Sequence, residues 1–266
     1  MNEAKGYAVV TGASSGIGHE LCKLFARDGY SLLLAARSAD KLAAFARDLT
    51  AAHRIDVRVC PVDLADTHGA EQVFAAAQAL DRDVEVLVNN AGFGSYGPFA
   101  EANLTDMLQM LQLNVVTLTH LTRLFLPGFI DRGRGRVMNV ASTAAFQPGP
   151  LMAVYYATKA FVLHFSEALD EELRDTAVRV SAFCPGPTAT GFKSRAQLEE
   201  SKLFNQPQNV MDAGVVAEVG YRGLLKGQRV VIPGFWNKLL VQGSRIMPRR
   251  LVTSIVRNMQ ERRAPG

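Results

Sequence analysis

Two side chains in the stretch VYYATKAF, residues 154–161, have the types and the spacing of a proton-transfer pair. Tyr155 and Lys159 are four residues apart, so on a helix they share a face, whereas Tyr156 points elsewhere and is expected to be packing or pocket wall. An unperturbed phenol has a pKa of about 10, which is poorly matched to acid–base catalysis near neutral pH. A nearby ammonium favours the phenolate, so we expect Lys159 to lower the pKa of Tyr155.

A third polar side chain, Ser142, follows an apolar run and precedes Tyr155 by 13 residues. Its hydroxyl is suited to hydrogen-bond a substrate oxygen on which negative charge develops. Each group also has a plain structural explanation, because a serine at a strand end is often a turn residue and an exposed helix often carries a tyrosine and a lysine. Together, the three favour catalysis.

A glycine-rich turn, TGASSGIG, follows the first apolar run and contains Gly12, Gly16 and Gly18. A strand, a glycine turn and a helix start bring backbone N–H groups close to a pyrophosphate. The spacing is GxxxGxG rather than GxGxxG, and by itself it is also compatible with an ordinary tight turn.

The elements that must position these residues alternate along the chain. Helical patterns with apolar residues three and four apart separate seven short β-rich runs, which predicts a doubly wound, Rossmann-like parallel α/β sheet with helices on both faces. We expect a single domain over 1–266, with a basic amphipathic extension at 233–266. An insertion at 187–210 is expected to be a substrate lid, with an ordinary surface helix as the alternative. The predicted strands are Tyr7–Thr11, Ser31–Ala35, Asp56–Val62, Val84–Asn89, Arg136–Ala141, Val178–Cys184 and Arg229–Ile232.

With these motifs in order, the chain resembles the short-chain dehydrogenase/reductases over about residues 6–232. The resemblance rests on TGxxxGIG, Asp63 after the third strand, NNAG at 89–92, Ser142 followed by YxxxK, and Pro185-Gly186. It implies that Asn114, Ser142, Tyr155 and Lys159 are catalytic, that Asn114 holds a water, and that a positive nicotinamide ring helps Lys159 to lower the pKa of Tyr155. It also implies cofactor contacts from Gly12, Ser14, Ser15, Gly16, Ile17, Gly18, Arg37, Asp63, Asn90, Ala91, Gly92, Tyr155, Lys159, Pro185, Gly186, Thr188 and Thr190.

The end of the second strand bears on the choice of cofactor. Ala36 stands where NAD users of the family tend to carry aspartate, and Arg37 follows it. Because guanidinium binds phosphate in a bidentate manner, the sequence favours NADP(H), with NAD(H) possible. The alternative is an exposed loop arginine, and Ser15 stands where many NADP-dependent relatives have a second basic residue.

Three loops are expected to form the substrate pocket, and their large side chains are apolar: Phe93, Tyr96, Phe146, Met152 and Phe192. Such a pocket suits a hydrophobic ketone or secondary alcohol that is steroid-, fatty-acyl- or xenobiotic-like. The chain continues for 34 residues beyond Ile232, so it resembles the hydroxysteroid and β-ketoacyl-CoA reductase branch more than the compact β-ketoacyl-ACP reductases.

Composition bounds the remaining possibilities. Three cysteines without CxxC spacing and no apolar run of about 18 residues predict a soluble, cytoplasmic protein, and five scattered histidines predict no metal. The net charge is +4, yet residues 226–263 carry nine Lys/Arg and one acid. This tail could pack on its own domain or a sister subunit, or contact a membrane, and no aromatic stacking motif supports nucleic acid. A homodimer or homotetramer is implied by the resemblance alone.

The sequence therefore predicts an NADPH-dependent carbonyl reductase or alcohol dehydrogenase. The alternative is a catalytically silent NAD(P)-binding sensor or scaffold, which has no need of all four catalytic residues. A peripheral membrane protein that acts through the basic tail is a third possibility and is compatible with catalysis.

Overall fold

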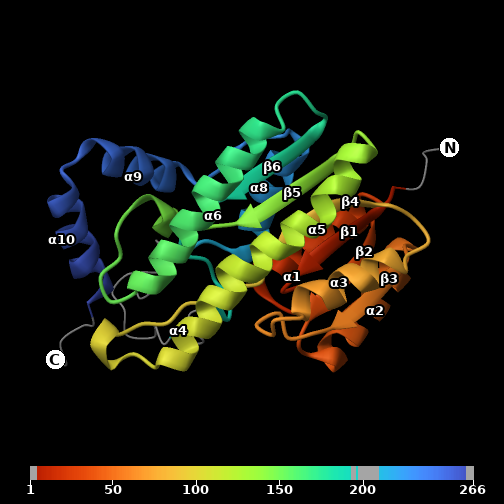
Figure 1. Ribbon diagram of the computed structural model, residues 1–266, viewed down its shortest axis with the longest axis horizontal. Helices are drawn as coiled ribbons and strands as arrows, with labels where there is room; N and C mark the ends of the chain where they lie inside the picture. The colour runs from red at the N-terminus through yellow and green to blue at the C-terminus, as the bar shows by residue number, and fades with distance from the viewer. Residues whose placement is uncertain (1–4, 193–195, 197–209, 262–266) are drawn as a thin grey trace.

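The computed structural model of the chain describes residues 5–192, 196 and 210–261. Its centre is a seven-stranded parallel sheet with the order β3-β2-β1-β4-β5-β6-β7 (Figure 1). The order reverses between β1 and β4, which is where doubly wound sheets open a binding crevice. The strands are β1 Tyr7–Thr11, β2 Ser31–Ala36, β3 Val57–Pro61, β4 Val84–Asn89, β5 Gly135–Val140, β6 Val178–Phe183 and β7 Val230–Val231.

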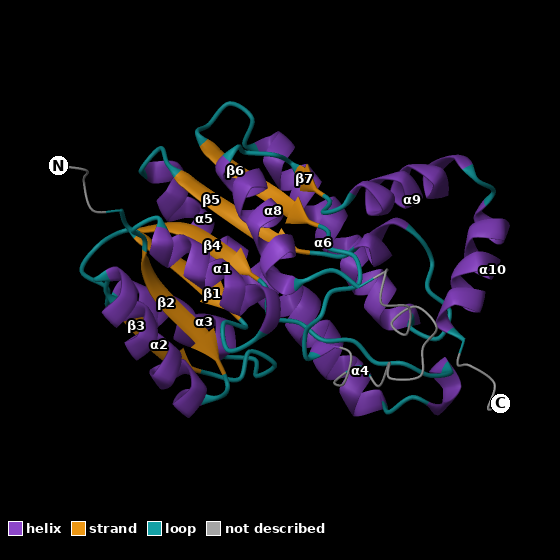
Figure 2. Ribbon diagram, turned by 180° about the vertical axis from the view of Figure 1, so that it is seen from behind, coloured by secondary structure: helices purple, strands orange, loops and turns teal. Residues whose placement is uncertain are grey.

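Helices cover both faces of the sheet, which explains the nearly continuous apolar strands. The helices α1, α2 and α8 lie over one face of the sheet (Figure 2). Phe25 and Tyr221 are buried in the core on this face. The other face carries α3, α5 and α6, with Phe125 and Phe129 in the core. The helices are α1 Gly16–Arg27, α2 Ala39–His53, α3 Gly69–Gln78, α4 Leu104–Leu111, α5 Leu118–Asp131, α6 Ala153–Glu172, α8 Ala213–Leu225, α9 Phe235–Ile246 and α10 Arg249–Gln260, with short 3-10 turns η1 Phe99–Glu101 and η3 Thr143–Phe146.

The predicted fold class and all seven predicted strands are confirmed, with small differences at the strand ends. The third and seventh strands are shorter than expected, and β7 pairs with only two residues of β6. The fifth strand ends at Val140, so Ser142 lies beyond the ladder and caps η3 instead.

A π-helical turn, η2 Gln112–Thr117, joins α4 to α5 and contains Asn114. Such turns are rare and often mark functional sites. Within the described residues, the combined stretch Leu104–Asp131 is the one helix that is long and apolar enough to cross a membrane. Here it lies against the sheet, and Leu121, Phe125 and Phe129 are part of the core.

The C-terminal extension forms α9 and α10 at the far side of the domain from β3 (Figure 1). Only part of the predicted apolar face of α10 packs inward: Val252 and Val256 are buried, whereas Leu251 and Ile255 are half-exposed. Most of the predicted lid at 187–210 lies outside the described residues, which include 187–192, 196 and 210.

Candidate active site

One cleft of about 760 Å³ opens at the carboxyl ends of the strands. It brings together nearly all of the predicted site residues from separate segments of the chain. Of the predicted cofactor and catalytic residues, those that line it are Gly12, Ser14, Ser15, Gly16, Ile17, Arg37, Asp63, Asn90, Ala91, Gly92, Ser142, Tyr155, Lys159, Pro185, Gly186, Thr188 and Thr190. Gly18 and Asn114 lie behind this surface, where they position it.

The glycines of the first turn allow backbone to approach backbone. Gly12 has φ +65°, and a Cβ there would lie 2.7 Å from the side-chain nitrogen of Asn90 and 3.1 Å from the backbone Cα of Ala91. A Cβ on Gly18 would lie 2.4 Å from the same nitrogen, so Gly18 acts through packing rather than through the cleft surface. Gly16 has φ +58° and sits against Thr190.

Thr11 ties this turn to the loop after β4. Its hydroxyl accepts hydrogen bonds from the backbone N–H groups of Asn90 and Ala91, at 2.9 and 3.0 Å. The Asn90 amide in turn donates to the carbonyl of Thr11 at 2.8 Å. Sequence reasoning missed Thr11, although it belongs to the TG pair that opens the glycine motif.

The N-terminus of α1 fits a pyrophosphate. The helix begins at Gly16, its N-cap Ser15 makes no side-chain capping bond, and its first turn carries no acid. The first N–H groups of a helix lack internal partners and favour negative charge. This turn could therefore hold the phosphates of a dinucleotide, as the sequence predicts.

Arg37 and Asp63 lie in the same cleft, at the ends of β2 and β3. Arg37 is exposed, and no described carboxylate pairs with it. The Asp63 carboxylate accepts from the N–H of Ala65 at 3.0 Å. A free guanidinium beside Ala36 suits a 2′-phosphate better than a ribose hydroxyl.

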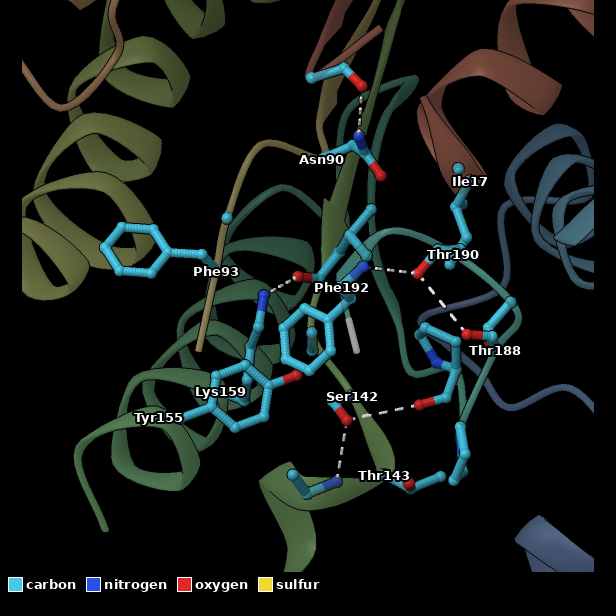
Figure 3. Close-up of a pocket in the computed structure, with 18 of the residues that line it drawn as sticks. Ile17, Asn90, Phe93, Ser142, Thr143, Tyr155, Lys159, Thr188, Thr190 and Phe192 are labelled. Atoms are coloured by element: carbon cyan, nitrogen blue, oxygen red, sulfur yellow. Dashed lines mark hydrogen bonds between the residues drawn. The ribbon is translucent and has the colours of Figure 1, made fainter. Parts of the chain in front are cut away.

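Tyr155 and Lys159 lie one turn apart on α6, and both are buried (Figure 3). The Lys159 ammonium lies 5.9 Å from the centre of the Tyr155 ring and donates to the carbonyl of Val140 at 2.7 Å. It therefore points into the protein near the phenol. Ser142 follows β5, and its hydroxyl and that of Tyr155 face the same space.

The sequence analysis expects Lys159 to lower the pKa of Tyr155. When only the protein groups act on Tyr155, this expectation is wrong. Burial raises the pKa of Tyr155, and the Ser142 hydroxyl offsets this only partly. Burial also lowers the pKa of Lys159 to about 8. The physical reason is desolvation: both groups are shielded from water, and the ammonium is bonded to a carbonyl rather than to the phenol.

Asn114 clamps the loop after β4 onto α6. Its amide accepts from the N–H of Phe93 at 3.1 Å, and donates to the carbonyl of Phe93 at 2.9 Å and to Thr158 at 3.1 Å. A Cβ on Gly92 would lie 2.9 Å from the Asn114 oxygen and 3.5 Å from the Lys159 nitrogen. These contacts give Asn114 a positioning role, and the water predicted there stays a prediction.

The loop after β6 carries two threonines and Phe192 into the cleft. Thr188 donates to the carbonyl of Gly186 at 2.9 Å, and the Thr190 hydroxyl accepts from the N–H of Phe192 at 3.2 Å. The Phe192 ring lies 5.3 Å from the Tyr155 ring. The loop thus places an aromatic side chain next to Tyr155.

Three of the five predicted pocket residues, Phe93, Met152 and Phe192, line the cleft. In the described part of the chain, the other two, Tyr96 and Phe146, do not line it. Tyr96 donates to the backbone carbonyl of Gln260 at 2.8 Å and holds α10, while Phe146 packs under Arg245 of α9, with the guanidinium 5.6 Å from its ring. Both interactions depend on the C-terminal extension, whose position the sequence did not reveal.

Several wall residues were missed by sequence reasoning. The extension contributes Phe235, Trp236, Asn237, Leu240, Val241, Val256, Met259 and Gln260 to the cleft. Gly94 has a steric role, since a Cβ there would lie 2.9 Å from Phe192 and 3.1 Å from Tyr155. A glycine two residues after NNAG was the available signal. Tyr156, expected as packing or wall, is buried and lines the cleft.

Comparisons with known proteins agree with this geometry. The family model described as "short chain dehydrogenase" matches residues 6–201. A very-long-chain 3-oxoacyl-CoA reductase of Pyrenophora tritici-repentis is 30% identical over 96% of this chain and 76% of its own length. Two solved structures are each 29% identical. A short-chain dehydrogenase from Sphingobium yanoikuyae in complex with NADPH has a TM-score of 0.81, with 98% of each chain covered. A bulky-bulky ketone specific alcohol dehydrogenase from Comamonas testosteroni has a TM-score of 0.76 and covers 92% of this chain and 95% of its own. The chain therefore belongs to the short-chain dehydrogenase family, the NAD(P)-dependent oxidoreductases of CH–OH and keto groups.

Proposed function

We propose that this protein is an NADPH-dependent carbonyl reductase, reversible as an alcohol dehydrogenase, which acts on a large hydrophobic ketone or secondary alcohol. The observation that carries the proposal is a single cleft lined by Arg37, by Ser142, Tyr155 and Lys159, and by an apolar wall. Two similar proteins, a very-long-chain 3-oxoacyl-CoA reductase and a bulky-ketone alcohol dehydrogenase, support a large substrate.

In the direction of reduction, Tyr155 is the proton donor. Because burial raises its pKa, the phenol keeps its proton near neutral pH and is ready to act as an acid. Ser142 donates to the Pro185 carbonyl at a long 3.4 Å, so its proton is easily redirected to the ketone oxygen. The bound nicotinamide supplies the hydride.

The Lys159 ammonium has hydrogen-bond donors that the Val140 carbonyl does not use. An ammonium carries three N–H groups, and the Val140 carbonyl accepts from one of them. The others could hold the cofactor ribose and favour negative charge on the phenol, while α1, Asn90 and Arg37 hold the phosphates and the adjoining groups. Asn114 fixes the loop that carries Gly92 next to this ammonium.

The experiment for this function is a panel of ketones that range from small to bulky, assayed with NADPH and with NADH. Hydrophobic ketones are expected to be reduced, with kcat/KM higher for NADPH. Arg37→Ala should cut the NADPH preference by about tenfold or more, because a charge-assisted phosphate contact is worth about 1.5–3 kcal/mol. An unchanged preference would refute the assignment of Arg37.

The competing function is a silent NAD(P)-binding sensor or scaffold. The buried arrangement of Tyr155 and Lys159 argues against it, because a buried lysine is costly and a scaffold gains nothing from it. Binding of NADPH without turnover of any ketone or alcohol in the panel would favour the sensor.

We also propose that α9 and α10 contact an anionic membrane surface. Their exposed apolar side chains are Phe235, Trp236, Leu239, Leu240, Ile246, Met247, Leu251 and Ile255. The same helices carry exposed Lys238, Arg245, Arg249, Arg250 and Arg257, which suit anionic headgroups. Phe235 and Trp236 also line the cleft, so a lipophilic substrate could enter from the lipid side.

Co-sedimentation with vesicles of phosphatidylcholine and phosphatidylserine tests this contact. The double variant Ile246→Ser, Leu251→Ser should pellet less than wild type. Val215→Ser, at an apolar position on α8 that is about as exposed as Leu251, should pellet like wild type. Equal pelleting of all three proteins would show that α9 and α10 do not bind the membrane.

A cytoplasmic homodimer or homotetramer completes the proposal. The three cysteines are free and buried, which suits a reducing compartment. Half-exposed Val116 and Phe161 lie on the helical segments that follow Asn114 and Tyr155, and could meet a second copy. Light scattering on purified protein would report a monomer if this part is wrong.

A further inference from the structure

The last residue of α10, Gln260, is almost wholly buried, with 1% of its surface exposed. Its side-chain nitrogen donates to the Tyr156 hydroxyl at 2.7 Å, and its backbone carbonyl accepts from the Tyr96 hydroxyl at 2.8 Å. The C-terminal helix is thus fastened to the catalytic helix and to the loop after β4. Gln260 is held in place from both sides.

The side-chain oxygen of Gln260 is buried and has no hydrogen-bond partner in the described part of the chain. Exchanging the amide oxygen and nitrogen would not remove the problem, because the nitrogen would then lack a partner. Buried polar atoms are nearly always paired, so a fixed, unpaired amide atom points to a ligand group that pairs with it.

The Tyr156 hydroxyl supplies the complementary group. It accepts from Gln260, so its own proton is available, and no described residue accepts it. The Tyr156 ring is also fixed, because it packs so closely on Gly149 that a Cβ there would lie 2.1 Å from the ring. The wall thus presents one acceptor and one donor side by side.

Both residues line the same cleft as the catalytic groups. The rings of Tyr155 and Tyr156 are 6.0 Å apart, and Phe93, Met152 and Val256 belong to the same apolar cluster. When the carbonyl of a substrate lies at Tyr155, the part of the substrate that extends toward Gln260 therefore lies against apolar side chains.

We propose that Gln260 and Tyr156 form a polar subsite that binds a hydroxyl group of the substrate, remote from the reacting carbonyl. A hydroxyl both donates and accepts, so it can donate to the Gln260 oxygen and accept from Tyr156, whereas a lone carbonyl satisfies only one of them. The substrate class is then a hydrophobic ketone that carries a second, hydroxylated position. This inference rests on the proposed function.

The test compares straight-chain methyl ketones of medium length with their ω-hydroxy counterparts, using NADPH as reductant. Wild type should prefer a hydroxy ketone by about tenfold or more at the chain length that spans the subsite, because an analogue without the hydroxyl leaves buried groups unpaired. In Gln260→Met and Tyr156→Phe, kcat/KM should fall about tenfold more on that hydroxy ketone than on the plain ketone. Asn258→Met, which also replaces a side-chain amide by methionine but at an exposed position of α10, should retain the preference.

No preference in wild type at any chain length would overturn the subsite. An equal loss on both ketones in Gln260→Met, with a lowered Tm, would also overturn it, since that result means that Gln260 only anchors α10. If no ketone is reduced, the proposed function fails, and the subsite is then judged by thermal shift with NADP present. A larger stabilisation by the hydroxy ketone, lost in Gln260→Met, supports it, and equal shifts contradict it.

Discussion

Replacing Lys159 by methionine is expected to stabilise the fold at neutral pH while it removes activity. The ammonium is buried and bonded to the Val140 carbonyl, and burial lowers its pKa from the ordinary 10.5 to about 8. Between these two values, the unfolded chain binds a proton that the folded chain has released. The stability of wild type therefore rises with pH across this window.

The size of the effect follows from the gap between the two pKa values. At about 1.4 kcal/mol per pKa unit, the buried charge costs the folded protein about 3 kcal/mol at neutral pH. Methionine carries no proton, so Lys159→Met avoids this cost. It also loses the bond to Val140, but that loss is nearly independent of pH and does not affect the trend.

Urea unfolding of wild type and Lys159→Met between about pH 7 and pH 10 measures the difference. The free energy of unfolding of the variant relative to wild type should fall by about 2–3 kcal/mol across this range. Lys226→Met, at an exposed position, controls for the loss of one lysine. If the free energies of unfolding of wild type and Lys159→Met change with pH in parallel, Lys159 is not held as a buried cation.

Two further substitutions test how the cleft is built. Gly94→Ala places a Cβ 2.9 Å from Phe192 and 3.1 Å from Tyr155, so kcat/KM for bulky ketones should fall about tenfold more than for small ones. The matched control is Gly243→Ala, whose Cβ would have its nearest neighbour 4.0 Å away. Equal losses of kcat/KM on bulky and small ketones in Gly94→Ala would show that Gly94 does not set the size of the substrate that the site accepts. Asn114→Ala removes the two hydrogen bonds that Asn114 makes with the N–H and the carbonyl of Phe93, so urea unfolding should show a loss of about 1–3 kcal/mol together with a lower kcat. Unchanged stability would contradict the clamp.

The sheet and the placement of Tyr155 beside Lys159 were predictable because each depends on local sequence. The buried strands are short apolar runs, and four-residue spacing by itself places Tyr155 beside Lys159. The same holds for the glycine turn, whose residues must follow β1 directly. These features need no knowledge of distant contacts.

Features that depend on contacts between distant segments were not predictable. The sequence predicts Tyr96 and Phe146 as pocket residues, but Tyr96 hydrogen-bonds to α10 and Phe146 packs against α9. For the protein groups alone, burial raises the pKa of Tyr155 and the Lys159 ammonium is bonded to a carbonyl, which the four-residue spacing could not show. The unpaired oxygen of Gln260 arises only once the chain end meets α6.

Proton donation by Tyr155 is tested most directly by Tyr155→Phe, assayed with NADPH and a hydrophobic ketone that wild type reduces. The substitution removes one hydroxyl and leaves the ring that packs against Phe192. We expect NADPH to bind with its wild-type Kd while kcat falls by about a hundredfold or more. A kcat within a few-fold of wild type would mean that another group delivers the proton.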